Sequence, residues 1–226
     1  MKKLILIDGN AILHRAYHSL PPFSTSSGEV TNAIYGFMRM LLDIYKKARP
    51  QYLGIAWDRK APTFRHVEYK EYKATRAAPP DDLYPQLPRL KELLDAFNIP
   101  QLEKDGYEAD DILGTLAHKA EQENDLQTII VTGDKDAFQL VTEKTHVLTP
   151  VKGISEIVMY DPIKVKEKMG VTPDQIVDYK AICGDASDNI KGVNGIGPKQ
   201  CTTLLEKYKT LDGIYEHLDE LSETQR

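Results

Sequence analysis

Three short apolar runs that each end at an aspartate constrain the fold of this chain most strongly. Their sequences are "KKLILID" (residues 2–8), "QYLGIAWD" (51–58) and "LQTIIVTGD" (126–134). Apolar runs of this length are typical of strands that are buried on both faces, as in a parallel sheet covered by helices. We therefore expect three central strands, with Asp8, Asp58 and Asp134 at their carboxyl ends.

Segments with the spacing of an amphipathic helix separate these runs. They are residues 31–48, about 82–97 and 109–120. Strands that alternate with helices of this length predict an α/β fold with a mostly parallel central sheet and helices on both faces. Open sheets of this kind bind ligands beyond the carboxyl ends of their strands, so the three aspartates are expected to face one rim.

The pattern changes after about residue 160. The sequence "DPIKVKEKMG" predicts a helix that is capped by Asp161 and ends at Gly170. Short helices and glycine-rich turns follow it. We expect residues 1–172 to form the α/β core and residues 173–226 to form a smaller helical unit.

Composition leaves the partner of the chain open. The formal charge of −5 and the sequence pI of about 5.7 argue against a polyanionic partner. Residues 59–76, however, carry six Lys or Arg against two Glu, and the local field matters more to a nucleic acid than the net charge. The basic segment, residues 59–80, is therefore either a solvated loop or a surface for single-stranded nucleic acid, because its cations and aromatic rings suit phosphates and bases.

The sequence predicts neither a membrane partner nor an oxidising compartment. The first apolar run covers only residues 4–7 before Asp8, which is too short for a signal peptide or a membrane span. Cys183 and Cys201 form no CxxC pair and suit a reducing cytoplasm. We therefore expect a cytoplasmic protein.

Three acidic motifs add carboxylates to the expected rim. The motif "GYEADD" supplies Glu108, Asp110 and Asp111, "TGDKDAF" supplies Asp134 and Asp136, and "CGDASDNI" supplies Asp185 and Asp188. With Asp8 and Asp58 these make nine carboxylates, which would raise one another's pKa values unless cations bind. Ligands that are all oxygen favour Mg²⁺ or Mn²⁺, and two such ions can activate water and stabilise a leaving oxygen in phosphodiester cleavage.

The alternative is that these acids only cap helices and turns. Acids in a first helical turn complement the helix dipole, and Asp134 and Asp188 are both suitable capping residues. Beside the apolar stripe of residues 109–120, Glu108 and Asp110 lie at the edges, whereas Asp111 lies opposite. Geometry therefore supports Asp111 least of the three as a ligand.

The sequence "GVNGIGPKQ" places glycines at 192, 195 and 197 just before a helix. Glycines permit a tight turn and a close backbone approach, and amides at a helix start can hold a phosphate with help from Lys199. One reading is an ordinary glycine-rich turn. The pattern also resembles the helix–hairpin–helix motif, which binds duplex backbone without sequence preference.

Six motifs in a fixed order resemble one known family. They are "LILIDGNAILHRAYH", "GIAWDRKAPTFRH", "YKEYKATR", "GYEADDILGTLA", "VTGDKDAFQLV" and "GDASDNIKGVNGIGPKQC". The set is similar to the 5′-nuclease domain of bacterial DNA polymerase I, a member of the flap endonuclease family, and it covers essentially the whole chain. The resemblance implies a PIN-like core with a helix–hairpin–helix region. It also implies metal-dependent cleavage of DNA at 5′ flaps, nicks and 5′ ends, in DNA repair and the removal of replication primers.

The resemblance also assigns roles to residues. It makes all nine carboxylates metal ligands, and we expect Asp58 and Asp134 to act in catalysis as well. The basic segment corresponds to the family's arch over the active site, so we call it the arch segment. There Lys73 and Arg76 would contact the scissile phosphate, Tyr72 would stack on an unpaired base, and Arg65 would contact DNA.

By the same resemblance, the hairpin would hold the uncleaved duplex with help from a bound K⁺. Its contacts would come from Gly192, Gly195, Gly197 and Lys199. The family's nuclease region usually continues past the point where this sequence stops, and in polymerase I a polymerase follows. A polymerase domain in the same full-length chain is therefore an expected partner.

We therefore predict a structure-specific 5′-nuclease that uses two Mg²⁺ or Mn²⁺ ions and is associated with the nucleoid. A PIN-type ribonuclease shares the acidic core but needs neither arch nor hairpin. A non-catalytic DNA-junction binding module would use the acids only as caps. A small-molecule phosphatase built on "DKD" is the most remote alternative.

Overall fold

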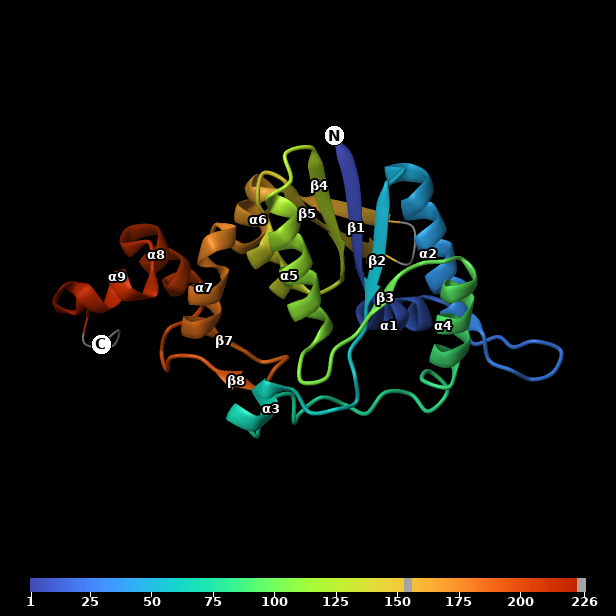
Figure 1. Cartoon of the computed structure of the whole chain (residues 1–226). Coiled ribbons are helices and arrows are strands. Elements are labelled where there is room, and N and C mark those ends of the chain that lie inside the picture. Colours follow the sequence, from blue (N-terminus) through green and yellow to red (C-terminus); the bar gives the residue numbers. More distant parts are fainter. Residues whose placement is uncertain (153–155, 223–226) are drawn as a thin grey trace.

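A six-stranded sheet lies at the centre of the computed structural model, which describes residues 1–152 and 156–222. Its strands are β1 (Lys2–Asp8), β2 (Tyr52–Ala56), β3 (Gln101–Leu102), β4 (Leu126–Val131), β5 (Thr145–Lys152) and β6 (Glu156–Tyr160). The strand order is β3-β2-β1-β4-β5-β6, and only β6 runs antiparallel to its neighbour (Figure 1). The predicted α/β fold with a mostly parallel sheet is confirmed.

Two hydrophobic cores cover the two faces of this sheet. Successive strand residues point to opposite faces, so Ile5 and Ile7 enter one core while Leu6 enters the other. The first core contains α1 (Gly9–Ser19), α2 (Asn32–Ala48) and α4 (Gln86–Ala96). The second contains α5 (Ala109–Glu121) and the helices that follow β6. The prediction that helices cover both faces of the sheet is therefore confirmed.

The carboxyl-terminal part is helical, as predicted. It contains α6 (Pro162–Met169), η2 (Pro173–Gln175), α7 (Ile176–Cys183), α8 (Pro198–Tyr208), α9 (Leu211–Glu216) and η3 (Leu218–Glu220). A short hairpin of β7 (Gly184–Asp185) and β8 (Ile190–Lys191) joins α7 to the turn before α8. The second hydrophobic core continues across the predicted boundary at residues 172 and 173, so the two parts share one interior. The last four residues of the predicted helical unit lie outside the described residues.

The arch segment lies beneath the carboxyl ends of the strands (Figure 1). Its one helix, α3 (Phe64–Glu68), follows the N-cap residue Thr63. The Thr63 hydroxyl lies 2.8 Å from Nδ1 of His66 in a capping box. The segment is docked on the β7–β8 turn, because the Asn189 side-chain amide donates to the Glu71 carbonyl oxygen at 2.8 Å. The long basic stretch is therefore an ordered element rather than a free loop.

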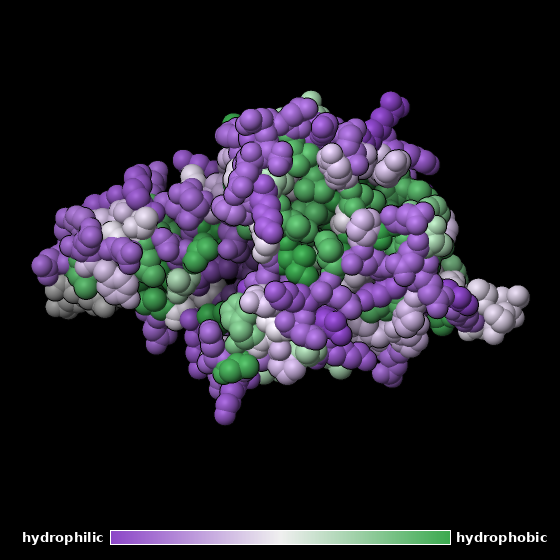
Figure 2. All heavy atoms as spheres, viewed as in Figure 1, coloured by the Kyte–Doolittle hydropathy of each residue, from purple (hydrophilic) through white to green (hydrophobic). Residues whose placement is uncertain are grey.

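Hydropathy differs between the parts of the molecule. Figure 2 shows apolar atoms over the middle of the sheet face beside α5, whereas the arch segment below it and the α8–α9 region are mostly hydrophilic. Within residues 1–152 and 156–222, no helix is both long and apolar enough to cross a membrane.

Candidate functional site

The nine predicted carboxylates surround two adjoining cavities beyond the carboxyl ends of the strands. The larger cavity, of about 640 Å³, is lined by seven of them: Glu108, Asp110, Asp111, Asp134, Asp136, Asp185 and Asp188. The smaller cavity, of about 290 Å³, is lined by Asp8, Asp58, Glu108, Asp110 and Asp134. Three of the carboxylates line both cavities, so the acidic surface is continuous from one to the other.

The elements that start at this rim position the carboxylates. Asp8 is the last residue of β1 and caps α1, accepting a hydrogen bond from the Ala11 amide at 2.9 Å. Glu108 is the N-cap residue of α5. Asp134 caps η1 (Lys135–Leu140) and accepts from the Asp136 amide at 2.9 Å. Capping and metal binding are therefore compatible roles, since both need negative charge at the start of a helix.

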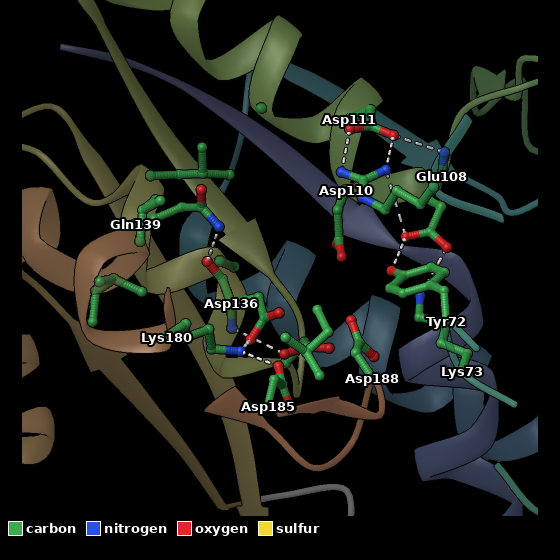
Figure 3. Close-up of a pocket in the computed structure, with 18 of the residues that line it drawn as sticks. Tyr72, Lys73, Glu108, Asp110, Asp111, Asp136, Gln139, Lys180, Asp185 and Asp188 are labelled. Carbon is green, nitrogen blue, oxygen red and sulfur yellow. Dashed lines mark hydrogen bonds and ion pairs between the residues drawn. The ribbon is translucent and has the colours of Figure 1, made fainter. Parts of the chain in front are cut away.

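Burial and mutual repulsion act most strongly on two of the carboxyl groups. Burial raises the pKa of Asp8 to about 6, although its side chain also accepts from the Thr132 hydroxyl at 2.8 Å. Burial, and then the charges of Asp8, Asp134 and Asp58, raise the pKa of Asp110 to about 7. Asp110 points from α5 into the larger cavity (Figure 3). The cluster thus carries unfavourable negative charge that a divalent cation would relieve.

Three carboxylates form the tightest group. One oxygen each of Asp136, Asp185 and Asp188 lies within 4.8 Å of the others. These residues come from η1 and from the β7–β8 hairpin, which the fold brings together although nearly fifty residues separate them in the chain. Oxygens this close, with no nitrogen or sulfur among them, suit a hard divalent ion.

Asp111 has a different environment from the other acids of its motif. Its two oxygens accept from both terminal nitrogens of Arg65 at 2.8 Å, and one also accepts from the Glu108 amide at 2.9 Å. Burial acts to raise the pKa of Asp111, but the hydrogen bonds from Arg65 and the Glu108 amide, with the charge of Arg65, together lower it below its ordinary value. The carboxylate is therefore already neutralised and partnered here, and its role as a metal ligand stays a prediction.

The basic residues of the arch segment reach the acidic cluster itself. The Lys73 ammonium donates to Glu108 at 2.8 Å, and the Arg76 guanidinium donates to Asp188 at 2.7 Å and to the Ser187 carbonyl at 3.2 Å. These contacts place both expected phosphate-binding side chains at the mouth of the site. They also tie the arch segment to two carboxylates of the cluster.

Tyr72 lies differently from what its expected stacking role requires. Its side chain is only 6% exposed, and its hydroxyl donates to Glu108 at 2.9 Å. The ring meets His66 edge-on at 5.2 Å, and the Lys73 ammonium lies 4.8 Å from its centre. Because the ring is almost fully buried, a base could stack on Tyr72 only if the arch segment moved.

The sequence interpretation missed Lys180. Its ammonium contacts Asp136 and donates to Asp185 at 2.6 Å (Figure 3). Burial acts to raise the pKa of Asp185, but the hydrogen bonds and charge of Lys180 and the hydrogen bonds of Ser187 together lower it to about 2. The only sequence signal was a lysine five positions before Asp185. In a continuous helix, residues five apart do not face each other, and here the two side chains meet because α7 ends at Cys183, between them.

The hairpin between α7 and α8 is as tight as its glycines suggest. A Cβ added at Gly192 would lie 2.3 Å from the carbonyl carbon of Cys183, and Gly195 has a φ of +83°. Gly197 is the N-cap residue of α8 and has open space around it. Lys199 is exposed in the first turn of that helix. The Gly197 amide donates to the Gln200 side-chain oxygen at 3.2 Å and Pro198 has no amide hydrogen, so fewer amides at this helix start are available to a ligand.

Two family descriptions divide the chain between them. The one described as "5′-3′ exonuclease, N-terminal resolvase-like domain" matches residues 3–170, and "5′-3′ exonuclease, C-terminal SAM fold" matches residues 171–226. The chain belongs to the 5′-3′ exonuclease family. The resemblance drawn from the six motifs is therefore confirmed.

Relatives of this exonuclease-family chain are similar over nearly all of it. DNA polymerase I of Bacillus subtilis (strain 168) is 44% identical over 221 residues, which cover 98% of this chain and 25% of the relative. The 5′-3′ exonuclease of Aquifex aeolicus (strain VF5) is 43% identical over 217 residues, which cover 96% of this chain and 73% of the relative. The chain thus spans about a quarter of the length of the polymerases that it matches.

Solved structures show the same fold. T5 5′-exonuclease with bound zinc has a TM-score of 0.79 at 23% identity, with 98% of this chain and 81% of that chain covered. A variant of the bacteriophage T5 flap endonuclease, in a pseudo-enzyme-product complex with DNA and metal ions, has a TM-score of 0.78 at 22% identity and the same coverage.

The donor set of this exonuclease-family site fits divalent metal ions. It consists of carboxylate oxygens, three of which converge within 4.8 Å, and burial together with repulsion raises the pKa values of two others. The Lys180 ammonium already stands between Asp136 and Asp185, where it does part of what a cation would do. The carboxylate oxygens can therefore hold cations, with the basic side chains Lys73 and Arg76 of the arch segment next to them.

Proposed function

We propose that the chain is a structure-specific 5′-nuclease that hydrolyses DNA phosphodiesters with two divalent ions, Mg²⁺ or Mn²⁺. The observation that carries the proposal is a single cavity lined by seven of the nine predicted carboxylates and by Lys73 and Arg65 of the arch segment. The names of the relatives, 5′-3′ exonuclease and DNA polymerase I, support it. Its cellular roles would be DNA repair and the removal of replication primers in the cytoplasm, at the nucleoid.

The carboxylates would divide into two ligand groups. Asp136, Asp185 and Asp188 would hold one ion, since their oxygens lie within 4.8 Å of one another. The group around Asp110 would hold the other with Asp8, Asp58 and Asp134, whose charges already act on it. When bound, such ions supply a nucleophilic water at neutral pH and stabilise the leaving oxygen.

The cations of the chain would act on the phosphate. Lys73 and Arg76 now bind Glu108 and Asp188, at 2.8 and 2.7 Å. If metal ions engaged those carboxylates, the two side chains would be free to bind the scissile phosphate and to stabilise its added charge in the transition state. Arg65 holds Asp111 at 2.8 Å and would support the Glu108 end of the site while its exposed part faces DNA.

The hairpin would bind the uncleaved duplex through backbone. Gly192, Gly195 and Gly197 would let the turn approach the phosphates closely, Lys199 would add a positive charge, and a K⁺ ion held at the turn would add another. Substrates would be 5′ flaps, nicks and 5′ ends, and a polymerase domain in a longer chain would be the partner. The T5 relative in complex with DNA and metal ions supports a DNA substrate.

One assay separates this proposal from its alternative, a PIN-type ribonuclease. The protein is given a labelled 5′-flap DNA with Mg²⁺, the same DNA with EDTA, and a single-stranded RNA with Mg²⁺. We expect Mg²⁺-dependent cleavage near the flap junction and little RNA cleavage. Absence of a metal-dependent cut would overturn the proposal, and preferential cleavage of RNA would favour the ribonuclease.

A further inference from the structure

The ammonium of Lys180 lies where a cation is needed. It contacts Asp136 and donates to Asp185 at 2.6 Å, and both belong to the three carboxylates whose oxygens lie within 4.8 Å of one another. Figure 3 shows it between these two acids, with Asp188 on the far side of Asp185. A divalent ion at these three carboxylates would lie close to the Lys180 ammonium, and the two positive charges repel each other.

The backbone holds Lys180 beside the acids while its side chain remains able to turn. Its helix, α7, is anchored by the buried Ile176 and Ile182. The Lys180 side chain is 24% exposed and lines the larger cavity, so a rotation about its flexible stem would move the ammonium into that space. Lys73 and Arg76 differ, since they belong to the arch segment and each pairs with a single carboxylate, Glu108 or Asp188. Lys180 instead contacts two of the three carboxylates.

We propose that Lys180 is a built-in counter-ion of the Asp136–Asp185–Asp188 site and competes there with the divalent ion. The inference rests on the proposed metal-dependent function and adds a positioning residue to it. With no ion bound, Lys180 holds Asp136 and Asp185 together, although they come from η1 and β7. When an ion binds, it displaces the ammonium into the cavity, where a phosphate would run.

Competition makes this the weaker of the two metal sites. An incoming ion must break the two charge-assisted contacts of Lys180, besides the Arg76–Asp188 pair, before it gains its own, and such contacts are stronger than neutral hydrogen bonds. The site around Asp110 has no such obstacle, since among the described residues no ion pair engages Asp110, Asp8 or Asp134. The two sites should therefore fill one after the other as the metal concentration rises.

The test is calorimetric titration of Mn²⁺ into the full chain without DNA. Four proteins are compared: wild type, Lys180→Met, Lys180→Arg and Lys168→Met. Methionine keeps the length of the side chain without its charge, and arginine keeps the charge. Lys168 is an exposed lysine of α6 and serves as the matched control. Circular dichroism establishes that each variant is folded.

We expect Lys180→Met to bind Mn²⁺ at the weaker site about tenfold more tightly or better, a change of about 1.4 kcal/mol. Lys180→Arg and Lys168→Met should keep the wild-type affinity at that site. In EDTA, Lys180→Met should unfold at a lower temperature than wild type. Adding Mn²⁺ should then raise the melting temperature of Lys180→Met more than that of wild type. Equal Mn²⁺ affinities in wild type and Lys180→Met would overturn the inference alone. No Mn²⁺ binding by any of the four would overturn the proposed function with it.

Discussion

Replacing Asp110 by Asn should stabilise the protein in the absence of metal. Asp110 is mostly buried at the start of α5, and the charges of Asp8, Asp134 and Asp58 oppose its ionisation. Among the described residues it accepts no hydrogen bond that an asparagine would lose. The substitution therefore removes a repelled charge with almost no change of shape.

The sign and the size of the effect follow from the pKa. The folded protein holds the Asp110 proton more tightly than the unfolded chain, so the carboxyl favours folding below about pH 4, and this contribution is lost as the pH rises to about 7. One pH unit is worth about 1.4 kcal/mol, so a rise from 3.8 to about 7 sets an upper limit of about 4 kcal/mol. The neighbouring acids share this repulsion, and we expect about 2 kcal/mol, or roughly 4–8 °C, for a domain of this size.

Thermal unfolding in EDTA at pH 8 and pH 4 measures this directly. The variant should melt higher than wild type at pH 8 and nearly the same at pH 4. Asp81→Asn, at an exposed position before α4, is the matched control and should change neither value. Mg²⁺ at pH 8 should raise the melting temperature of wild type more than that of the variant. An Asp110→Asn protein that is no more stable at pH 8, or equally stabilised at pH 4, would refute the reasoning.

Two further substitutions test the hairpin and the arch segment. Gly192→Ala places a methyl group 2.3 Å from backbone of Cys183 and should lower the free energy of unfolding by about 3 kcal/mol or more in urea, whereas Gly197→Ala, in open space, should cost much less. Equal losses of stability in the two variants would contradict the close approach of Gly192 to the Cys183 backbone. Asn189→Gly keeps a backbone with a φ of 59° but removes the 2.8 Å hydrogen bond to Glu71, so amide hydrogen exchange in the arch segment should speed up about fivefold. Unchanged exchange would mean that this bond does not hold the arch segment.

Apolar patterning was enough to predict the centre of the fold but not its margins. The runs that became β1, β2 and β4 are continuous, and α2 and α5 have clear stripes, so their types and approximate bounds could be predicted. The helix α1 was not predicted, because Gly9 and Asn10 are poor helix formers directly after a strand. Its first residue instead depends on tertiary packing, since a Cβ at Gly9 would lie 2.4 Å from Trp57.

The site was predictable in its residue types and less so in its pairing. Strand ends and motif spacing indicated which acids share a rim, and the cavities are lined by all nine. The partners of those acids depend on contacts across the chain that no local pattern shows. Arg65 binds Asp111 from 46 residues away, and Lys180 contacts Asp136 from 44 residues away. The family resemblance predicted Asp111 as a metal ligand, whereas in the structure its carboxylate is hydrogen-bonded to Arg65.

The measurement that tests the central claim most directly is the cleavage rate of Asp134→Asn. Asp134 lines both cavities, so it should serve the metal centre whichever cavity holds the reacting phosphate. Under single turnover with Mg²⁺ and a 5′-flap DNA, we expect a loss of at least about 100-fold relative to wild type and to Asp81→Asn. Flap binding in Ca²⁺ should remain within about threefold, a change below 1 kcal/mol. Cleavage at the wild-type rate by Asp134→Asn would contradict the claim that these carboxylates form a catalytic metal centre.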